Sequence, residues 1–455
     1  MKNKIILSLI YLLAFNLLNA QTYNIDEFME LVVKNNKDIL IAKKELEIAE
    51  TQDAMARSGA YPYIQAGANY KRNFKNAYMY ADFSGLLKMI QQMLPPNPNP
   101  TPPPPGTQTG GASKFKINYK NEFSANASVT QQIFNFSVFK AISAAKQYQK
   151  LSGNIFDATM IGIKNGSKKA FYQTLLLKEL LNVNKESEKN ANENYIELKK
   201  KYEVGIASEL EMLQAEVRWQ NSIPQLTQAE RNYQLALNSL KTLAGLKYSD
   251  KFEIEGNLDI KQKPLMKIEM ADVFNNRPDY KAMVSEKELR ETNVGVESAA
   301  HYPSLSVSFI YSYAAQSDYF KLERENYFLF GQLNLQVPIF NGWRTTAQVQ
   351  EAQIQADQVE LKIQKFKNSI YTEIKNLELK LNEAEKRINS AKATLGIAKK
   401  AFNIAEATTE NGLSTQLELK DARLGYDQAR LNYLSAMYEY LESYFDWELA
   451  VGIAK

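Results

Sequence analysis

The side chains that most often perform acid–base chemistry or bind metals are scarce in this chain. Its 455 residues contain no cysteine and a single histidine, His301. Histidine is the usual general acid or base near neutral pH, and cysteine and histidine are the usual zinc ligands. The sequence also lacks a constellation typical of a glycosidase or a protease. We therefore expect no catalytic residue, no metal site and no cofactor, and we interpret the protein as a non-enzyme in which His301 lies at a helix–strand junction.

The first 20 residues predict a secretory signal peptide. Lys2 and Lys4 precede an apolar segment, and Ala20 offers a small residue at the cleavage point. A transmembrane anchor is the alternative, but the apolar run is short for a bilayer. Without the leader, 53 basic residues face 51 acidic ones, a balance that does not favour nucleic acid as a partner. No other stretch approaches 18 apolar residues, so a mature membrane protein would have to use β-strands.

The longest periodic stretch begins at Val337 and ends near Glu410. It runs without proline after Pro338, and from Ile374 its apolar residues recur at alternating steps of three and four. They are Leu377, Leu381, Ala384, Ile388, Ala391, Leu395, Ala398, Phe402 and Ala405. This spacing is typical of a left-handed coiled coil, and the helix would be on the order of 100 Å long. A filament-type coiled coil is the alternative.

Four shorter segments alternate apolar and polar residues, at about 61–72, 119–133, 303–313 and 329–339. In the third, Leu305, Val307, Phe309, Tyr311 and Tyr313 alternate mainly with serines. Such strands suit a barrel with one face toward lipid and one toward water. A half-buried soluble hairpin is the alternative for any one pair.

The chain also repeats itself. Asn36-Lys37-Asp38 matches Arg277-Pro278-Asp279 at a separation of 241 positions, and Gly205 matches Gly412 at 207. We predict a signal peptide (1–20), a first repeat (21–245) with a long helix at 137–204 and a tip at 205, a connection (246–266), and a second repeat (267–455) with a long helix at 343–411 and a tip at 412. Each repeat reads helix, strand, strand, long helix, glycine turn, return helix.

One insertion accounts for the change of separation between the repeats. Residues 73–118 of the first repeat contain a proline-rich loop at 95–105, preceded by a possible short amphipathic helix. Polyproline segments lack internal hydrogen bonds and can bind SH3-like domains. We favour an exposed loop between two strands.

Four strands are too few to close a transmembrane barrel, for which eight is about the lower limit. Open edges are not tolerated in lipid. We therefore expect several copies of the chain to share one barrel under cyclic symmetry, with two copies giving 8 strands and three giving 12.

In these features the chain resembles the TolC-like outer-membrane efflux protein family, also called outer membrane factors. The resemblance is carried by the paired tips, 202–210 and 410–417, and by the paired strand exits, 131–135 and 336–342. It implies a homotrimer with a long coiled-coil helical barrel and a 12-stranded β-barrel in outer-membrane lipid, extending into the periplasm. It also implies a passive exit duct for efflux or type I secretion, driven by an RND-type or ABC-type inner-membrane pump through a periplasmic adaptor protein.

The resemblance further implies that the two tips meet the adaptor. The candidate docking residues are Val204, Gly205, Ile206, Ala207, Ser208 and Leu210 at the first tip, and Asn411, Gly412, Leu413, Ser414, Thr415 and Leu417 at the second. The alternative is that both glycines merely reverse the chain, since glycine is common at helix ends.

A pore gate is implied six and nine positions after the second glycine, at Glu418 and Asp421. Rings of carboxylates favour cations in pores. Glu211 is the counterpart of Glu418, whereas Gln214 is not acidic. The tyrosine and arginine that latch some family members are replaced by Thr409 and Ser414, although Tyr202 is kept in the first repeat, so hydrophobic packing is the alternative means of closure.

A second function of a different class is a non-conducting, periplasm-spanning scaffold or adhesin built on the same coiled coil. The polar strand residues Ser306, Ser308, Asn334 and Gln336 favour a wet lumen over a filled one. The sequence leaves open the exported substrate and the identity of the pump and adaptor.

Overall fold

A computed structural model describes residues 21–95, 112–258, 264–411 and 413–454. The expected signal peptide, most of the proline-rich loop and the tip residue Gly412 lie outside the described residues. The chain divides into two compact units. The helical unit comprises residues up to 53, 144–294 and 350–455, and the sheet unit comprises 54–143 and 295–349.

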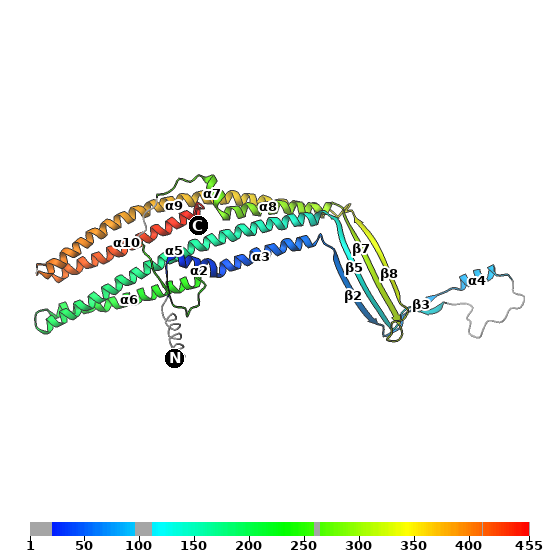
Figure 1. The fold of residues 1–455 in the computed structure, drawn as a ribbon, viewed down its shortest axis with the longest axis horizontal. Helices are drawn as coiled ribbons and strands as arrows, with labels where there is room; N and C mark the ends of the chain where they lie inside the picture. The colour runs from blue at the N-terminus through cyan, green and yellow to red at the C-terminus, as the bar shows by residue number, and fades with distance from the viewer. Residues whose placement is uncertain (1–20, 96–111, 259–263, 412, 455) are drawn as a thin grey trace, which may run out of the picture. The chain divides into compact units, whose positions relative to one another are not determined.

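Two long helical hairpins dominate the helical unit (Figure 1). The helices of the chain outside the insertion are α2 (Ile25–Asn35), α3 (Lys37–Ser58), α5 (Phe136–Glu203), α6 (Glu209–Leu243), α7 (Met270–Asn276), α8 (Pro278–Ser298), α9 (Arg344–Glu410) and α10 (Gln416–Ala450). The outgoing helices α5 and α9 contain 68 and 67 residues, so each is on the order of 100 Å long. Each is followed by a return helix of 35 residues, α6 or α10.

None of the helices in the described residues has the apolar length that crossing a lipid bilayer as a helix demands.

The core of the helical unit surrounds a short parallel pair of strands, β1 (Gln21–Tyr23) and β6 (Phe252–Ile254). Tyr23 stacks on Phe252 with 5.2 Å between ring centroids. The largest fully buried side chains include Trp447, Phe28, Phe171, Leu240 and Ile254. We call this region, with the adjoining ends of α2, α6, α7 and α10, the belt.

The first repeat is tied into the belt by Asn36, which we call the first belt anchor together with Leu243 and Gly245. The Asn36 side chain is buried and donates a hydrogen bond to the Leu243 carbonyl oxygen at the end of α6, at 2.9 Å. Its Oδ1 accepts from the backbone N–H groups of Asp38 and Ile39 and so caps α3. Gly245 has φ +64° and lies so close to Asn35 that an added Cβ would approach it within 3 Å.

The second belt anchor consists of Arg277, Ala450 and Gly452. Arg277 donates a hydrogen bond to the Ala450 carbonyl oxygen at the end of α10, at 2.9 Å. It also forms ion pairs with Asp279 at 2.7 Å and with Glu373 of α9 at 2.8 Å. Burial lowers the pKa of Arg277, but the hydrogen bonds that it donates to the Asp279 and Glu373 carboxylates outweigh burial and raise the pKa above its ordinary value.

The sheet unit contains one antiparallel sheet in the order β2-β5-β7-β8. Its strands are β2 (Tyr63–Arg72), β5 (Asn121–Asn135), β7 (Ser304–Ser317) and β8 (Asn326–Gln336). The second strand of the first repeat thus pairs with the first strand of the second repeat. His301 lies in the 3₁₀ turn Ala299–His301 directly before β7.

The register sorts the side chains of this sheet by polarity. Ile64, Val129 and Phe309 lie side by side across three strands, and Ala66, Ala127, Tyr311 and Leu329 lie across all four. On the opposite face Thr130, Ser308 and Gln332 are aligned, and the Thr130 and Ser308 hydroxyls are 3.0 Å apart. Opposed residues of an antiparallel pair share a face, so one face is apolar and the other is polar around Ser306 and Ser308 but carries Ile310, Phe328 and Phe330 farther along.

The insertion of the first repeat has its own small structure. A two-stranded ribbon, β3 (Tyr78–Ala81) and β4 (Ser113–Lys116), flanks the helix α4 (Ser84–Met93). The short helix suggested by the sequence is therefore present.

Candidate functional site at the helical tips

Glycine and a helix cap form the first tip, between α5 and α6. Gly205 has φ +77°, a left-handed conformation that glycine adopts at little cost. The Ile206 N–H donates to the Lys201 carbonyl oxygen at 2.7 Å, and the Gly205 N–H donates to that of Tyr202 at 2.9 Å. These bonds satisfy carbonyl groups left free at the end of α5 and reverse the chain within a few residues.

The second tip, between α9 and α10, repeats this bonding 207 positions later. The Leu413 N–H donates to the Thr408 carbonyl oxygen at 2.9 Å, which is the counterpart of the bond from Ile206 to Lys201. Gly412 itself lies outside the described residues.

Both return helices begin with a capping box. Ser208 and Thr415 accept hydrogen bonds from the backbone N–H groups of Glu211 and Glu418, each at 3.2 Å. In return, Glu211 and Glu418 accept from the backbone N–H groups of Ser208 and Thr415, at 2.8 and 2.9 Å. Hydrogen bonds from Ser208 lower the pKa of Glu211, and those from Ser414 and Thr415 lower that of Glu418. Both carboxylates thus bind their own helix N-terminus.

Apolar side chains are exposed at both tips. The first presents Val204, Ile206 and Leu210, each at least 64% exposed, and the second presents Leu413 and Leu417, at 81% and 59%. Isolated exposed apolar residues are ordinary, but a cluster at the end of a hairpin is typical of a binding surface.

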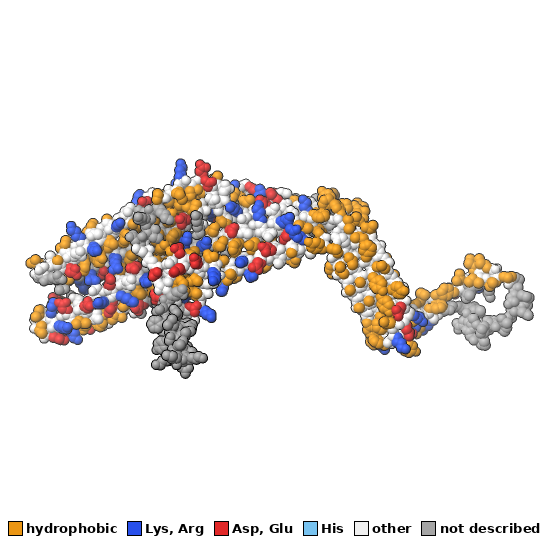
Figure 2. All heavy atoms as spheres, viewed as in Figure 1, with side chains coloured by type: hydrophobic (Ala, Val, Ile, Leu, Met, Phe, Trp, Pro, Cys, Tyr) orange, Lys and Arg blue, Asp and Glu red, His pale blue; other side chains and the backbone are white. Residues whose placement is uncertain are grey.

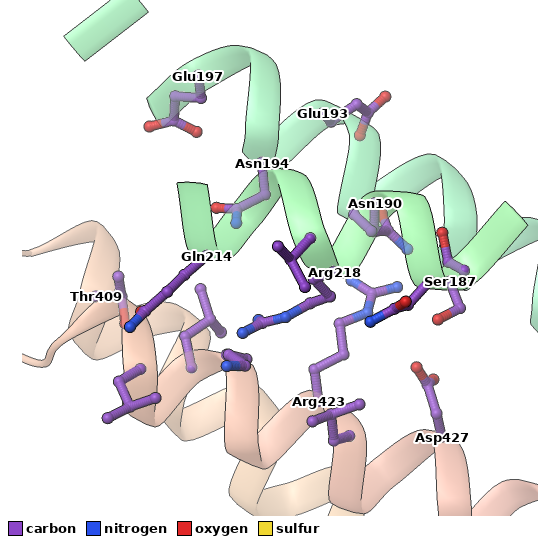
Figure 3. A pocket seen from close by; sticks show the side chains of 18 of the residues that line it. Ser187, Asn190, Glu193, Asn194, Glu197, Gln214, Arg218, Thr409, Arg423 and Asp427 are labelled. Carbon is purple, nitrogen blue, oxygen red and sulfur yellow. The ribbon is translucent and has the colours of Figure 1, made fainter. Parts of the chain in front are cut away.

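A cleft of about 1370 Å³ separates the two hairpins behind their tips (Figure 3). Apolar residues of the return helices line it in matching positions: Leu210 and Val217 on α6 correspond to Leu417 and Leu424 on α10, 207 positions later. The cleft therefore lies between equivalent faces of the two repeats.

Charged side chains from both hairpins reach into this cleft, as the labelled Arg218, Arg423 and Asp427 show in Figure 3. The Arg423 guanidinium lies 5.2 Å from the centre of the Phe402 ring. Burial lowers the pKa of Arg218, and the carboxylate of Asp421 on the opposite hairpin acts against that shift. Burial raises the pKa of Asp427, and the positive charge of Arg423 acts against that rise.

The predicted site residues occupy three different places. The predicted docking residues that the structure describes lie in or beside the two turns, and Leu210 and Leu417, in the first turns of α6 and α10, also line the cleft. Glu211 and Glu418 cap helices, whereas Asp421 is the predicted gate residue whose charge acts across to the other hairpin. Tyr202 is 40% exposed at the end of α5, and Thr409 lines the cleft.

Sequence reasoning missed the capping boxes and the role of Arg218. The patterns Ser208-x-x-Glu211 and Thr415-x-x-Glu418 are readable signals for the former. Arg218 and Asp421 are 203 positions apart, and no local pattern links them. Among the described residues, no group of three or more histidine and carboxylate side chains is arranged to hold a metal ion.

A sequence model of the family described as "Outer membrane efflux protein" matches residues 29–246 and 271–452, most of the chain. The chain belongs to the outer membrane efflux protein family. The resemblance inferred from the tips and strand exits is thereby confirmed, as are the outer-membrane location with a long periplasmic extension and the expectation that the protein is not an enzyme.

Relatives of this outer membrane efflux protein are distant in sequence. The toluene efflux pump outer membrane protein TtgC of Pseudomonas putida is 21% identical over 351 residues, which cover 76% of this chain but only 65% of TtgC. The Campylobacter jejuni CmeC outer membrane channel has a TM-score of 0.72 at 20% identity, covering 94% of this chain and 86% of CmeC. The Neisseria gonorrhoeae MtrE channel in its open state has a TM-score of 0.70 at 18% identity, with 94% and 88% covered. The last two comparisons show that the fold is that of these channels.

Proposed function

We propose that this outer membrane efflux protein is one subunit of a homotrimeric channel-tunnel. It acts as the passive exit duct of a tripartite efflux or type I secretion system, with a periplasmic adaptor and an RND-type or ABC-type inner-membrane pump. Three copies of the four-stranded sheet supply 12 strands, enough to close a barrel around water. The name of TtgC supports an efflux role, and the descriptions of CmeC and MtrE support an outer-membrane channel.

The observation that carries this proposal is the two-faced sheet. Its apolar face includes Leu329, Leu333 and Leu335, which are 65–71% exposed, so this chain alone does not cover them. The opposite face aligns Ser306 with Asn334 and Ser308 with Gln332. An apolar face toward lipid and a polar face toward a wet lumen are what a channel requires, whereas a filled scaffold has no need of the second.

Exposed apolar residues on the helices support the trimer. Ile41, Ile48 and Met55 recur every seven residues along α3 and are 45–63% exposed. On α9, Ile354 and Leu361 show the same spacing, at 51% and 64%. Sevenfold spacing keeps one stripe toward a partner helix, so these stripes are suited to pack against neighbouring copies.

Adaptor docking at the tips is supported by the apolar cluster around Ile206 and Leu413 and by the matching rows that line the cleft. The alternative is that the glycine turns only reverse the chain. Replacing Ile206 and Leu413 with serine should then leave adaptor co-purification unchanged. If the tips dock the adaptor, the double variant loses it while the channel still assembles.

The gate is proposed to use the carboxylate of Asp421 rather than that of Glu418 to attract cations. Glu418 is engaged by Ser414 and Thr415, while Asp421 acts electrostatically on Arg218 of the other hairpin. The Asp421→Asn variant should reduce cation preference in bilayer recordings. Gln214→Asp adds a carboxylate at the equivalent position of the first repeat and should increase it. If neither variant changes ion selectivity, the gate assignment is wrong.

The function as a whole is tested by purifying the mature chain in detergent, determining its native mass and recording single channels in planar bilayers. We expect trimers and discrete conductance steps. Monomers, or trimers that never conduct, would refute the duct, and the latter outcome would support the scaffold or adhesin.

A further inference from the structure

The insertion between β2 and β5 is held firmly at its base. Lys116 forms an ion pair with Asp318, which follows β7, at 2.5 Å, and Asp318 also accepts a hydrogen bond from the Lys120 N–H at 3.1 Å. Asn118 accepts one from the Ala77 N–H at 2.7 Å. The ribbon β3–β4 is therefore anchored to one end of the sheet.

An aromatic cluster marks that end of the sheet. Tyr70, Phe123 and Phe320 are in mutual contact, with ring centroids 4.9 to 5.5 Å apart. Aromatic residues concentrate where a membrane-spanning sheet meets the lipid headgroups. In the proposed function, on which this inference rests, the sheet spans the outer membrane, and the insertion then leaves the sheet at the level of the headgroups.

The insertion presents a continuous apolar face. On the ribbon, Met79 is paired with Phe115, and Phe115 contacts Phe83 with centroids 5.5 Å apart. The apolar side chains on α4 and at its C-cap are 47–78% exposed; they are Leu86, Met89, Ile90, Met93 and Leu94. Their spacing of three and four residues places them on one side of the helix. Figure 2 shows hydrophobic side chains gathered over the insertion.

The other face is cationic. Lys88 and Gln92 lie on the opposite side of α4 by helical spacing. On the ribbon, Tyr78 is paired with Lys116 and Tyr80 with Lys114, and the Lys114 ammonium lies 4.0 Å from the centre of the Tyr78 ring. Residues 73–118 contain four lysines and one aspartate. Because Asp318 pairs with Lys116, the remaining lysines are Lys75, Lys88 and Lys114.

We propose that this insertion binds an anionic lipid headgroup surface, with the α4 face that carries Met93 at the acyl boundary and its lysines near phosphate groups. A ten-residue helix is marginal in water, so α4 has to bury its apolar face to persist. A lipid surface is favoured over a second copy of the chain because an apolar stripe flanked by lysines and tyrosines matches a headgroup region in both polarity and charge.

The test uses the absence of native cysteine. In the full-length protein, Met93→Cys carries a fluorophore on the proposed lipid face, and Gln92→Cys carries it on the opposite face as a matched control. Leu333→Cys on the apolar face of β8 reports whether the sheet itself is in lipid. The proteins are placed in nanodiscs of phosphatidylcholine with or without phosphatidylglycerol, with a quencher attached to the lipid.

We expect the Met93 label to be quenched several-fold more than the Gln92 label in anionic discs. Adding Lys88→Gln and Lys114→Gln should reduce the quenching of the Met93 label to the level seen in phosphatidylcholine alone. Equal quenching of the Met93 and Gln92 labels, with the Leu333 label quenched, would overturn the lipid proposal and leave the channel proposal standing. Efficient disulfide formation between Met93→Cys copies in detergent would assign the face to a second copy instead. An unquenched Leu333 label would refute both proposals.

Discussion

The two belt anchors perform the same task with different side chains. In each, a buried side chain between two helices donates a hydrogen bond to the last turn of a return helix, Asn36 to Leu243 and Arg277 to Ala450. The acceptors are 207 positions apart and the donors 241. The duplicated chain has therefore preserved a backbone contact while the group that makes it has changed.

The difference lies in charge. Asn36 caps α3 as a neutral group, whereas Arg277 also joins α8 to α9 through Asp279 and Glu373. The positions of α5 that lie 206 and 207 before Glu373 are Ser167 and Gly166, and neither carries a charge that could form such a pair. The second repeat therefore depends on an ion-pair network that the first cannot form.

Removing the charged anchor should have the largest effect. Arg277→Ala deletes hydrogen bonds to Asp279, Glu373 and the Ala450 carbonyl group. Breaking a buried ion pair usually costs 3–5 kcal/mol, and the partial exposure of both carboxylates brings the expected loss of unfolding free energy to about 3 kcal/mol. Urea unfolding in detergent, followed by tryptophan fluorescence, measures it. Arg277→Lys keeps the positive charge and should lose less unfolding free energy. A loss below about 1 kcal/mol for Arg277→Ala would contradict the view that the charged anchor is the stronger of the two.

The close glycines should come next. Gly245→Ala places a Cβ at φ +64° within 3 Å of the Asn35 backbone, and Gly452→Ala places one at φ +78°, 2.9 Å from the Cβ of Asn276. We expect each variant to lose about 2 kcal/mol of unfolding free energy. The loss should be larger for Gly245, because its added Cβ meets a carbonyl oxygen. Gly396→Ala in α9, where nothing lies within 4 Å, is the control and should stabilise the protein slightly. Equal midpoints of urea unfolding for all three variants would show that the belt accommodates the added Cβ atoms without loss of stability.

The neutral anchor should matter less than the charged one. Asn36→Ala removes the cap of α3 and the bond to Leu243, for which about 1–2 kcal/mol is expected. Asn36→Asp retains the acceptor for the cap but cannot donate to Leu243, so it separates the two contributions. If Asn36→Ala costs more than Arg277→Ala, the added ion pairs contribute nothing to stability.

The smallest effects are expected at the tips, where the two repeats remain alike. Glu211 and Glu418 have lowered pKa values, so their capping contributes fully above the ordinary carboxyl pKa and is lost as the pH falls through the lowered value. Relative to the intrinsic exchange rate at each pH, the protection of amide groups in both tips should fall together in acid. Glu211→Gln and Glu418→Gln should remove that pH dependence, each at its own tip. A pH response confined to one tip would show that the two capping boxes do not contribute equally to their tips.

Repetition is what made the fold readable from the sequence. The match of Asn36-Lys37-Asp38 to Arg277-Pro278-Asp279 indicated equivalent positions, and alternating serines indicated the strand that runs from Ser304 to Ser317. The trimer and the closed barrel came from the family resemblance and remain proposals. Contacts between distant segments, such as Arg277 with Glu373 or Arg218 with Asp421, followed no local pattern because tertiary packing alone brings them together.

The order of the strands has a consequence for assembly. β2 and β8 form the two outer strands of the sheet and run in opposite directions. Any number of copies could thus be joined edge to edge with correct antiparallel pairing. Backbone hydrogen bonding between the strands therefore does not determine the number of subunits. Stoichiometry has to be decided by the curvature that the helices tolerate, so changes far from the membrane could alter how many polypeptides surround the pore.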